Sequence, residues 1–170
     1  LNPGAVSNGE VIDAHAVTNA LSQALKASKS KRKTAATAMW GNTVIVKKIT
    51  RPRIDNPATL DEEIQYEASH YIPFPIEEVS LEYHILKTAK NAAESMEILL
   101  VAAKREFIFR YIEAIEGSGL KCKLMDVSGF ALANSFEANY GVTDTPVAVL
   151  NIGAGITNFI VVERGEVIFS

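Results

Sequence analysis

Residues 151–158 carry the clearest potential for ligand binding in this sequence. They read Asn-Ile-Gly-Ala-Gly-Ile-Thr-Asn, so Gly153 and Gly155 stand two positions apart between two apolar segments. Glycines at this spacing let the backbone turn sharply and bring successive N–H groups close to an anion, and Thr157 adds a hydroxyl donor. A strand is expected to follow, and no Gly-Lys-Ser/Thr ending is present, so neither the Rossmann fingerprint nor the P-loop fits. Two interpretations stay open: a phosphate-binding hairpin, or an ordinary hairpin turn, in which glycine is common.

The other potentially reactive side chains predict neither a catalytic nor a metal site. Three histidines lie on different expected elements without a partner four residues away: His15, His70 and His84. Because Cys122 is the only cysteine, no intrachain disulfide and no cysteine-based metal cluster can form. Ser128-Gly129 lacks the Gly-x-Ser-x-Gly frame of a hydrolase. We therefore predict no catalytic residue and no metal ligand.

The basic residues are concentrated in one stretch of the chain. Residues 26–53 hold nine of the 17 lysines and arginines and no acid, whereas the rest of the chain carries 8 basic and 20 acidic residues, a net charge of −12. A solvated loop followed by the exposed face of a strand explains this pattern, and so does a surface that attracts phosphate, nucleic acid or anionic lipid. No aromatic residue alternates with these charges, so base stacking has little to build on and we predict no nucleic-acid partner.

The segment at 71–76, Tyr-Ile-Pro-Phe-Pro-Ile, is unusually apolar for a loop. Its two prolines end a preceding helix and exclude regular structure. Such a segment either covers a hydrophobic core or forms the wall of a groove for a partner. The sequence leaves both interpretations open.

Length and composition bound the class of protein. The chain has 170 residues, a net charge of −3 and 48% hydrophobic residues, which excludes disorder, collagen and a disulfide scaffold. The lone cysteine favours a reducing, cytoplasmic setting. The longest apolar run is far shorter than the roughly 20 residues that a membrane-spanning helix needs, so we expect no membrane span.

Hydrophobic periodicity predicts a mixed α+β or α/β fold. In the middle of the chain we expect a strand, a helix and two strands in that order: 44–50, 57–71, 79–85 and 96–103. The polar residues 88–95 favour an antiparallel hairpin between the last two strands. The helix is expected to bury a stripe of Leu60, Ile64, Ala68 and Tyr71. The first three of these should pack against Val44 or Val46 and Ile98 or Leu100.

The flanking segments predict further elements. Asp13 is a good N-cap for a helix that ends near Ser28. The remaining expected elements are strands at 34–39, 120–127, 147–152, 156–162 and 167–169 and helices at 107–117 and 128–140. The last helix is expected to bury Phe130, Ala133, Phe136 and Tyr140.

Five segments carry a resemblance to a known family. They are Asn8-Gly9-Glu10-Val11-Ile12-Asp13, Val44-Ile45-Val46-Lys47-Lys48-Ile49, Glu67-Ala68-Ser69-His70-Tyr71-Ile72-Pro73-Phe74-Pro75, Leu99-Leu100-Val101-Ala102-Ala103-Lys104 and Asn151-Ile152-Gly153-Ala154. In this order they resemble the type IV pilus assembly protein PilM family, which is similar to the cell-division protein FtsA. The resemblance implies a partial actin-like (ribonuclease H-like) lobe at 1–41 and 118–170. It also implies an inserted strand-helix-strand-strand (SHS2) subdomain at 42–117.

The resemblance further implies a cytoplasmic adaptor, peripheral at the inner membrane through its partners in the pilus assembly platform. It implies that the N-terminal cytoplasmic tail of PilN binds between the two subdomains, and we expect contacts from Tyr71, Pro73, Phe74 and Pro75. An ATP site with Mg is implied in the intact protein, at Asn151, Gly153, Ala154, Gly155, Ile156, Thr157 and Asn158. Actin-like proteins commonly carry an acid where this chain has Asn151, so hydrolysis should be poor.

The chain begins without Met and ends directly after an apolar segment, so we expect it to be a piece of a longer protein. A piece that holds half of a nucleotide site should bind little or no ATP by itself, and unpaired strand edges should make it self-associate into a homo-oligomer. The alternative function is a piece of another actin-like ATPase or of a sugar-kinase-like phosphotransferase. A kinase would need a general base, which this segment does not display.

Overall fold

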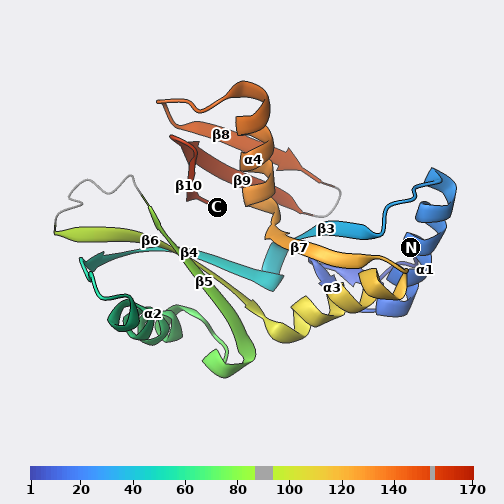
Figure 1. Cartoon of the computed structure of the whole chain (residues 1–170), viewed down its shortest axis with the longest axis horizontal. Helices are drawn as coiled ribbons and strands as arrows, with labels where there is room; N and C mark the ends of the chain where they lie inside the picture. The colour runs from blue at the N-terminus through green and yellow to red at the C-terminus, as the bar shows by residue number, and fades with distance from the viewer. Residues whose placement is uncertain (87–93, 154–155) are drawn as a thin grey trace.

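The computed structural model describes residues 1–86, 94–153 and 156–170. Helices and sheets alternate along these residues, and the mixed α/β class expected from the sequence is confirmed. The hydrophobic core is divided among three clusters of buried side chains. Figure 1 shows the corresponding three groups of elements. The first group contains α1, α3, β3 and β7 and lies on one side, and the second group contains α2, β4, β5 and β6 and lies on the other. The third group contains α4, β8, β9 and β10 and lies between the other two (Figure 1).

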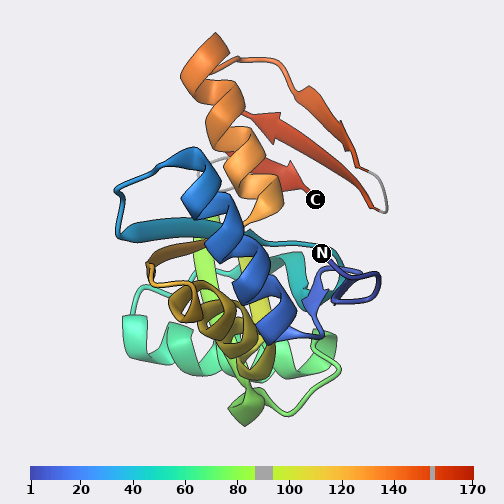
Figure 2. The ribbon, with the colours of Figure 1, turned by 90° about the vertical axis from the view of Figure 1, so that its right-hand side faces the viewer.

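The first group combines the beginning and the middle of the chain. β1 (Val6–Ser7) and β2 (Glu10–Val11) form a short hairpin, and α1 (Ala14–Ser28) leads to β3 (Thr34–Met39), which pairs in parallel with β7 (Lys121–Val127). The predicted N-cap is confirmed, because the Asp13 carboxylate accepts from the Ala16 N–H at 2.9 Å. α3 (Arg105–Gly117) lies beside α1 (Figure 2), and the Thr18 hydroxyl donates to the Ala114 carbonyl at 3.0 Å. The sequence expectation that residues 42–117 form one subdomain stays a prediction; α3 itself packs on α1.

The second group is an antiparallel sheet with one helix across it. A 3-10 turn (Gly41–Thr43) enters β4 (Val44–Pro52); α2 (Pro57–Tyr71) and a second 3-10 turn (Ile76–Glu78) precede β5 (Val79–Leu86) and β6 (Ser95–Lys104). The strands lie in the order β4-β6-β5, and the strand-helix-strand-strand order is confirmed. The expected antiparallel pairing of β5 with β6 is confirmed as well. Residues 87–93 of the connecting hairpin lie outside the described residues.

The residues of β4 that face α2 are shifted by one position from the prediction. Leu60, Ile64 and Ala68 of α2 are buried, as expected, and they share a core with Ile98 and Leu100. From β4, however, this core contains Ile49 and Ile45, so the predicted contacts with Val44 or Val46 are wrong. Alternate residues of a strand point to opposite faces, and Val44 and Val46 therefore lie on the far side of the sheet.

The end of α2 also differs from the prediction. Tyr71 is 41% exposed, so its expected burial is wrong. It is the last residue of the helix, and the next residue, Ile72, turns into the core in its place with 6% exposure.

The third group is a three-stranded antiparallel sheet with one covered face. It contains α4 (Ser128–Tyr140), β8 (Val147–Ile152), β9 (Thr157–Glu163) and β10 (Glu166–Phe169), in the strand order β10-β9-β8. Ala133 of α4 packs with Ile160, Val162 and Val167. The other face of the sheet leaves four large apolar side chains exposed: Leu150, Ile152, Phe159 and Phe169. The predicted burial of Tyr140 is wrong, because this last residue of α4 is 77% exposed.

Candidate functional site

The segment 151–158 forms the tip of the β8–β9 hairpin. Asn151 pairs with Asn158 and Ile152 with Thr157, and the Gly153 N–H donates to the Ile156 carbonyl at 3.0 Å. A Cβ atom at Gly153 would lie 2.7 Å from that carbonyl oxygen, so the turn requires glycine there. The expected hairpin is confirmed. Ala154 and Gly155, two further residues of the predicted phosphate loop, lie outside the described residues.

The hairpin register divides the polar side chains between two faces. Val149 pairs with Ile160, and this pair packs in the cluster that α4 covers. Because side chains two positions apart share a face, Asn151 and Asn158 lie on the α4 side of the sheet and Thr157 lies on the opposite side. The two asparagine amides are thus brought together, whereas the Thr157 hydroxyl is separated from them.

A cavity of about 420 Å³ lies beside the hairpin. Its polar side comprises Asn42, Thr157, Asn158 and Ser170 together with Ser128 and Gly129 at the beginning of α4. The rest of the lining is Trp40, Gly41, Val44, Ile45, Val46, Val127, Ile156 and Phe159. No side-chain cap is bonded to this end of α4, so its first-turn N–H groups are donors without a partner within the helix. Amide, hydroxyl and backbone N–H groups suit a phosphate, and the lining residues described include no Asp or Glu that could help to hold Mg²⁺.

Sequence reasoning did not single out Trp40 as part of a site, and it considered Ser128 and Gly129 only as a hydrolase motif. Their approach to the hairpin depends on how the second and third groups pack. A local signal did exist for Gly129, since a small residue in the first turn of a helix permits close approach of a ligand or another chain segment. A Cβ atom at Gly129 would lie 3.0 Å from the Ile160 side chain.

The β1–β2 turn supports the hairpin tip from behind. Asn8 and Gly9 have φ values of 50° and 87°, and a Cβ atom at Gly9 would lie 2.0 Å from the Trp40 carbonyl oxygen. A Cβ atom at Gly41 would meet both the Asn8 carbonyl oxygen at 2.6 Å and the Ile156 side chain at 2.9 Å. The turn, Gly41 and the hairpin tip are therefore in direct contact.

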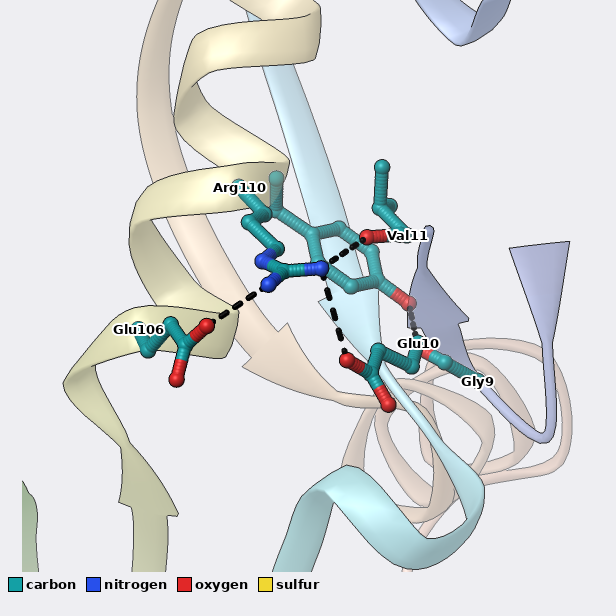
Figure 3. Close-up of polar contacts among 6 residues, drawn as sticks. Gly9, Glu10, Val11, Glu106 and Arg110 are labelled. Carbon is teal, nitrogen blue, oxygen red and sulfur yellow. Dashed lines mark hydrogen bonds and ion pairs between the residues drawn. The ribbon is translucent and has the colours of Figure 1, made fainter. Parts of the chain in front are cut away.

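Two residues of α3 hold this turn in place. The buried Tyr111 hydroxyl donates to the Gly9 carbonyl at 2.6 Å, and burial raises the pKa of Tyr111. Figure 3 shows the Arg110 guanidinium between two carboxylates, that of Glu106 at 2.6 Å and that of Glu10 at 3.5 Å. Arg110 also donates to the Val11 carbonyl at 3.4 Å. α3 thus fixes a turn that touches the candidate phosphate loop.

A second hollow separates the first and second groups. This cleft of about 380 Å³ is mostly apolar. Its lining comprises Met39, Val44, Val101, Ala103, Ile108, Met125, Val127 and Phe130, with Ser80, Glu82 and Asp126 as polar residues. These side chains come from the far face of the β4-β6-β5 sheet and from β3, α3, β7 and α4. From the sequence we expected a groove between subdomains, but none of these residues was assigned to it. The elements that face one another across the cleft are far apart in the chain, so no local pattern brings their residues together.

The segment 71–76 lies on the other face of the β4-β6-β5 sheet. Ile72, Phe74 and Ile76 pack against the core of the second group, and the Lys104 ammonium lies 4.4 Å from the centre of the Phe74 ring. Tyr71, Pro73 and Pro75 are exposed. The core-covering interpretation is thus confirmed for the three inward residues. The partner-binding role predicted for Tyr71, Pro73, Phe74 and Pro75 stays a prediction, and none of these four lines the cleft.

The comparison with known families decides the assignment. The model of the family described as type IV pilus assembly protein PilM matches residues 1–170. The chain belongs to this family.

A solved structure supports the same assignment. The chain is similar to a chain of the PilM-PilN type IV pilus biogenesis complex, with 27% sequence identity and a TM-score of 0.85. The match covers 99% of this chain and 50% of that one, so this chain spans about half the length of the PilM-family chain that it matches. The chain is also similar to the cytoplasmic domain of EpsL, an inner membrane component of the type II secretion system of Vibrio cholerae, at 14% identity and a TM-score of 0.49. That match covers 87% of this chain and 53% of the cytoplasmic-domain chain.

Other candidate sites of this PilM-family chain are less developed. No group of three or more His, Cys, Asp or Glu side chains within the described residues could hold a metal ion. His84 Nε2 lies 3.9 Å from the Glu166 carboxylate, between the second and third groups. Among the helices of the described residues, none is long and apolar enough to cross a bilayer.

Proposed function

We propose that this chain is the part of a PilM-family protein that binds the N-terminal cytoplasmic tail of PilN. It would thereby act as an adaptor of the type IV pilus assembly platform, held at the inner membrane through that partner. The observation that carries the proposal is the TM-score of 0.85, over 99% of the chain, to a chain of a PilM-PilN complex. That match covers 50% of the other chain, so we propose PilN binding only for the half of a PilM-family protein that this chain represents.

The cleft between the first and second groups is the proposed tail site. Its volume of about 380 Å³ and its apolar walls suit a few anchoring side chains of a short peptide. Val101 and Ile108 stand on β6 and α3, so a bound peptide would contact both groups. Glu82 and Asp126 provide acceptors that could orient the peptide backbone or a basic side chain.

Titration of a PilN tail peptide into isotope-labelled chain tests this site. We expect the largest resonance shifts at Val101, Ile108 and Phe130. Shifts centred on Tyr71, Pro73 and Pro75 would move the site to the opposite face of the sheet. Absence of any shift at saturating peptide would contradict the proposed partner.

We also propose that the complete protein binds ATP through the β8–β9 hairpin. The support is the arrangement described above: a turn that needs Gly153, the cross-strand pair Asn151 and Asn158, and a cavity that Asn158 lines together with the N-terminus of α4. Asn151, Asn158 and backbone N–H groups would hold the phosphates. ATP would supply a phosphate chain whose oxygens accept hydrogen bonds from these neutral donors. Since the described lining offers no carboxylate toward Mg²⁺, we propose a nucleotide-binding role with at most slow hydrolysis.

Calorimetry of ATP binding to the full-length protein tests the second proposal. Gly153→Ala places a Cβ atom 2.7 Å from the Ile156 carbonyl oxygen and should weaken ATP binding about tenfold or more. Gly165→Ala, in the turn at the other end of β9, serves as the control and should leave ATP binding unchanged. Equal ATP affinity of the wild type and Gly153→Ala would contradict the proposal.

A further inference from the structure

Seven basic side chains gather at one end of the molecule. We call them the basic end: Lys26, Lys29, Lys31, Arg32, Lys33, Lys121 and Lys123. All seven are exposed. They come from the end of α1, the α1–β3 loop and the beginning of β7, which lie next to one another in Figures 1 and 2. The Lys121 N–H donates to the Lys33 carbonyl at 2.8 Å, so the two chain segments are in direct contact.

The seven basic side chains of this end take no part in the ion pairs recorded among the described residues. The ion pairs and cation–π contacts found among the described residues involve none of the seven side chains. None of them lines the cavity beside the hairpin or the cleft between the groups. Their charges therefore face solvent without an intramolecular partner.

Acidic side chains are concentrated in a different part of the molecule. Residues 54–86, which form α2 and β5, contain eight Asp and Glu residues and neither Lys nor Arg. In Figure 1, α2 lies near the end of the long axis opposite α1. The neighbouring strand β4 carries three cations, two of which pair with Glu97 and Glu67, so the excess of negative charge belongs to α2 and β5 and not to the whole group. A planar anionic surface would attract the basic end and repel α2 and β5.

The composition of the basic end favours a lipid surface as the partner. Six of the seven residues are lysines, which act as point charges and do not require the bidentate geometry that arginine offers to a single phosphate. The segments 26–33 and 121–123 contain no aromatic residue on which a base could stack. Leu124 follows Lys123 within β7 and is 58% exposed, so an apolar side chain accompanies the cations.

We propose that the basic end docks on the anionic headgroups of a lipid bilayer and orients the chain with α2 and β5 away from the membrane. This contact goes beyond the binding of PilN and does not depend on it. Each lysine or arginine near an anionic membrane surface contributes about 1 kcal/mol of attraction, and seven of them lie together here. The attraction should weaken strongly as salt rises, because exposed charges are screened.

Vesicle co-sedimentation tests the proposal without PilN or nucleotide. The probe is a phosphatidylcholine vesicle that contains phosphatidylglycerol, compared with phosphatidylcholine alone at low and at high salt. Wild type should bind only the anionic vesicles. Neutralising Lys31, Arg32 and Lys33 together by Gln should weaken this binding about a hundredfold, because each cation contributes about fivefold.

A matched variant separates position from net charge. Lys47→Gln, Lys48→Gln and Arg53→Gln together remove the same charge outside the basic end and should weaken vesicle binding much less. Thermal unfolding should be similar in both variants, since all substituted side chains are at least partly exposed. Equal loss in the two variants, or wild-type binding to duplex DNA but not to anionic vesicles, would overturn the proposal.

Discussion

Tyr111 connects the fold to the candidate phosphate loop through one hydrogen bond. Its hydroxyl is buried and donates to the Gly9 carbonyl of the β1–β2 turn, which contacts Gly41 and through it Ile156. Removal of the hydroxyl leaves a buried carbonyl without this donor. The residue therefore stabilises the protein and positions the hairpin tip.

Tyr111→Phe should lower the free energy of unfolding by about 1–2 kcal/mol. The pKa of Tyr111 is raised by burial, so its contribution is fully present below the unfolded-state value of about 10 and is lost as pH rises through the folded-state pKa. Urea unfolding between neutral and alkaline pH measures both effects. The difference between wild type and variant should shrink at alkaline pH, while Tyr140→Phe, at an exposed position, should change nothing. A constant difference up to pH 11 would contradict the role of burial.

Gly9 and Gly119 form a matched pair for testing the close contact behind the hairpin. Both have positive φ, 87° and 88°, but a Cβ atom would meet the Trp40 carbonyl oxygen at 2.0 Å at Gly9 and nothing within 4 Å at Gly119. Gly119→Ala should cost only the backbone strain of about 1–2 kcal/mol. Gly9→Ala should cost about 1–3 kcal/mol more, because the backbone must shift. Thermal melts of both variants measure this difference, and equal melting temperatures would show that the turn is not packed as described.

At the scale of elements, helix ends could be predicted because their signals are local. Asp13 caps α1 as expected, and at the beginning of α2 the Asn56 Oδ1 accepts from the Ala58 N–H at 3.0 Å. The face of β4 could not be predicted, since Val44, Ile45 and Val46 are all apolar and both faces of the strand therefore carry apolar side chains. Pairing with β6 and coverage by α2 decide it, and both are long-range contacts.

The same division applies to the candidate site. The β8–β9 hairpin could be predicted because its two glycines and flanking strands are contiguous in the sequence. Trp40 and Ser128 line the same cavity only because separate elements meet there. The segment 71–76 is apolar throughout, so the sequence left a core cover and a groove wall open, and only the packing of Ile72 and Phe74 distinguishes them from Pro73 and Pro75.

α2 should owe its position to three buried side chains. Ile64 is 2% exposed in the centre of the second group, and Ile64→Ala should lower the free energy of unfolding by about 2–5 kcal/mol. Tyr66→Ala on the same helix is the control: Tyr66 is 65% exposed and its removal should cost about 0.5 kcal/mol or less. Denaturant titration of both variants gives the two values. An unchanged midpoint for Ile64→Ala would mean that α2 does not cover the sheet.

At the scale of the whole molecule, the bare face of the β10-β9-β8 sheet should drive self-association of this chain. Leu150, Ile152, Phe159 and Phe169 are each at least 45% exposed on one face. Light scattering should show a mass that rises with concentration. Ile152→Ser combined with Phe159→Ser should abolish this rise, whereas Tyr66→Ser combined with Phe109→Ser, at exposed apolar positions elsewhere, should not. A monomeric wild type into the hundreds of micromolar range would contradict the prediction.

The central claim is that the cleft between the β4-β6-β5 sheet and α3 receives the PilN tail. Ile108 and Phe109 are neighbours on α3, but Ile108 lines the cleft and Phe109 is 63% exposed outside it. The most direct measurement is the affinity of a PilN tail peptide for wild type, Ile108→Arg and Phe109→Arg by calorimetry, with thermal melts to confirm that both variants fold. We expect Ile108→Arg to weaken binding about tenfold or more and Phe109→Arg to leave it unchanged. Unchanged binding by a folded Ile108→Arg variant, or an equal loss in both, would contradict the claim.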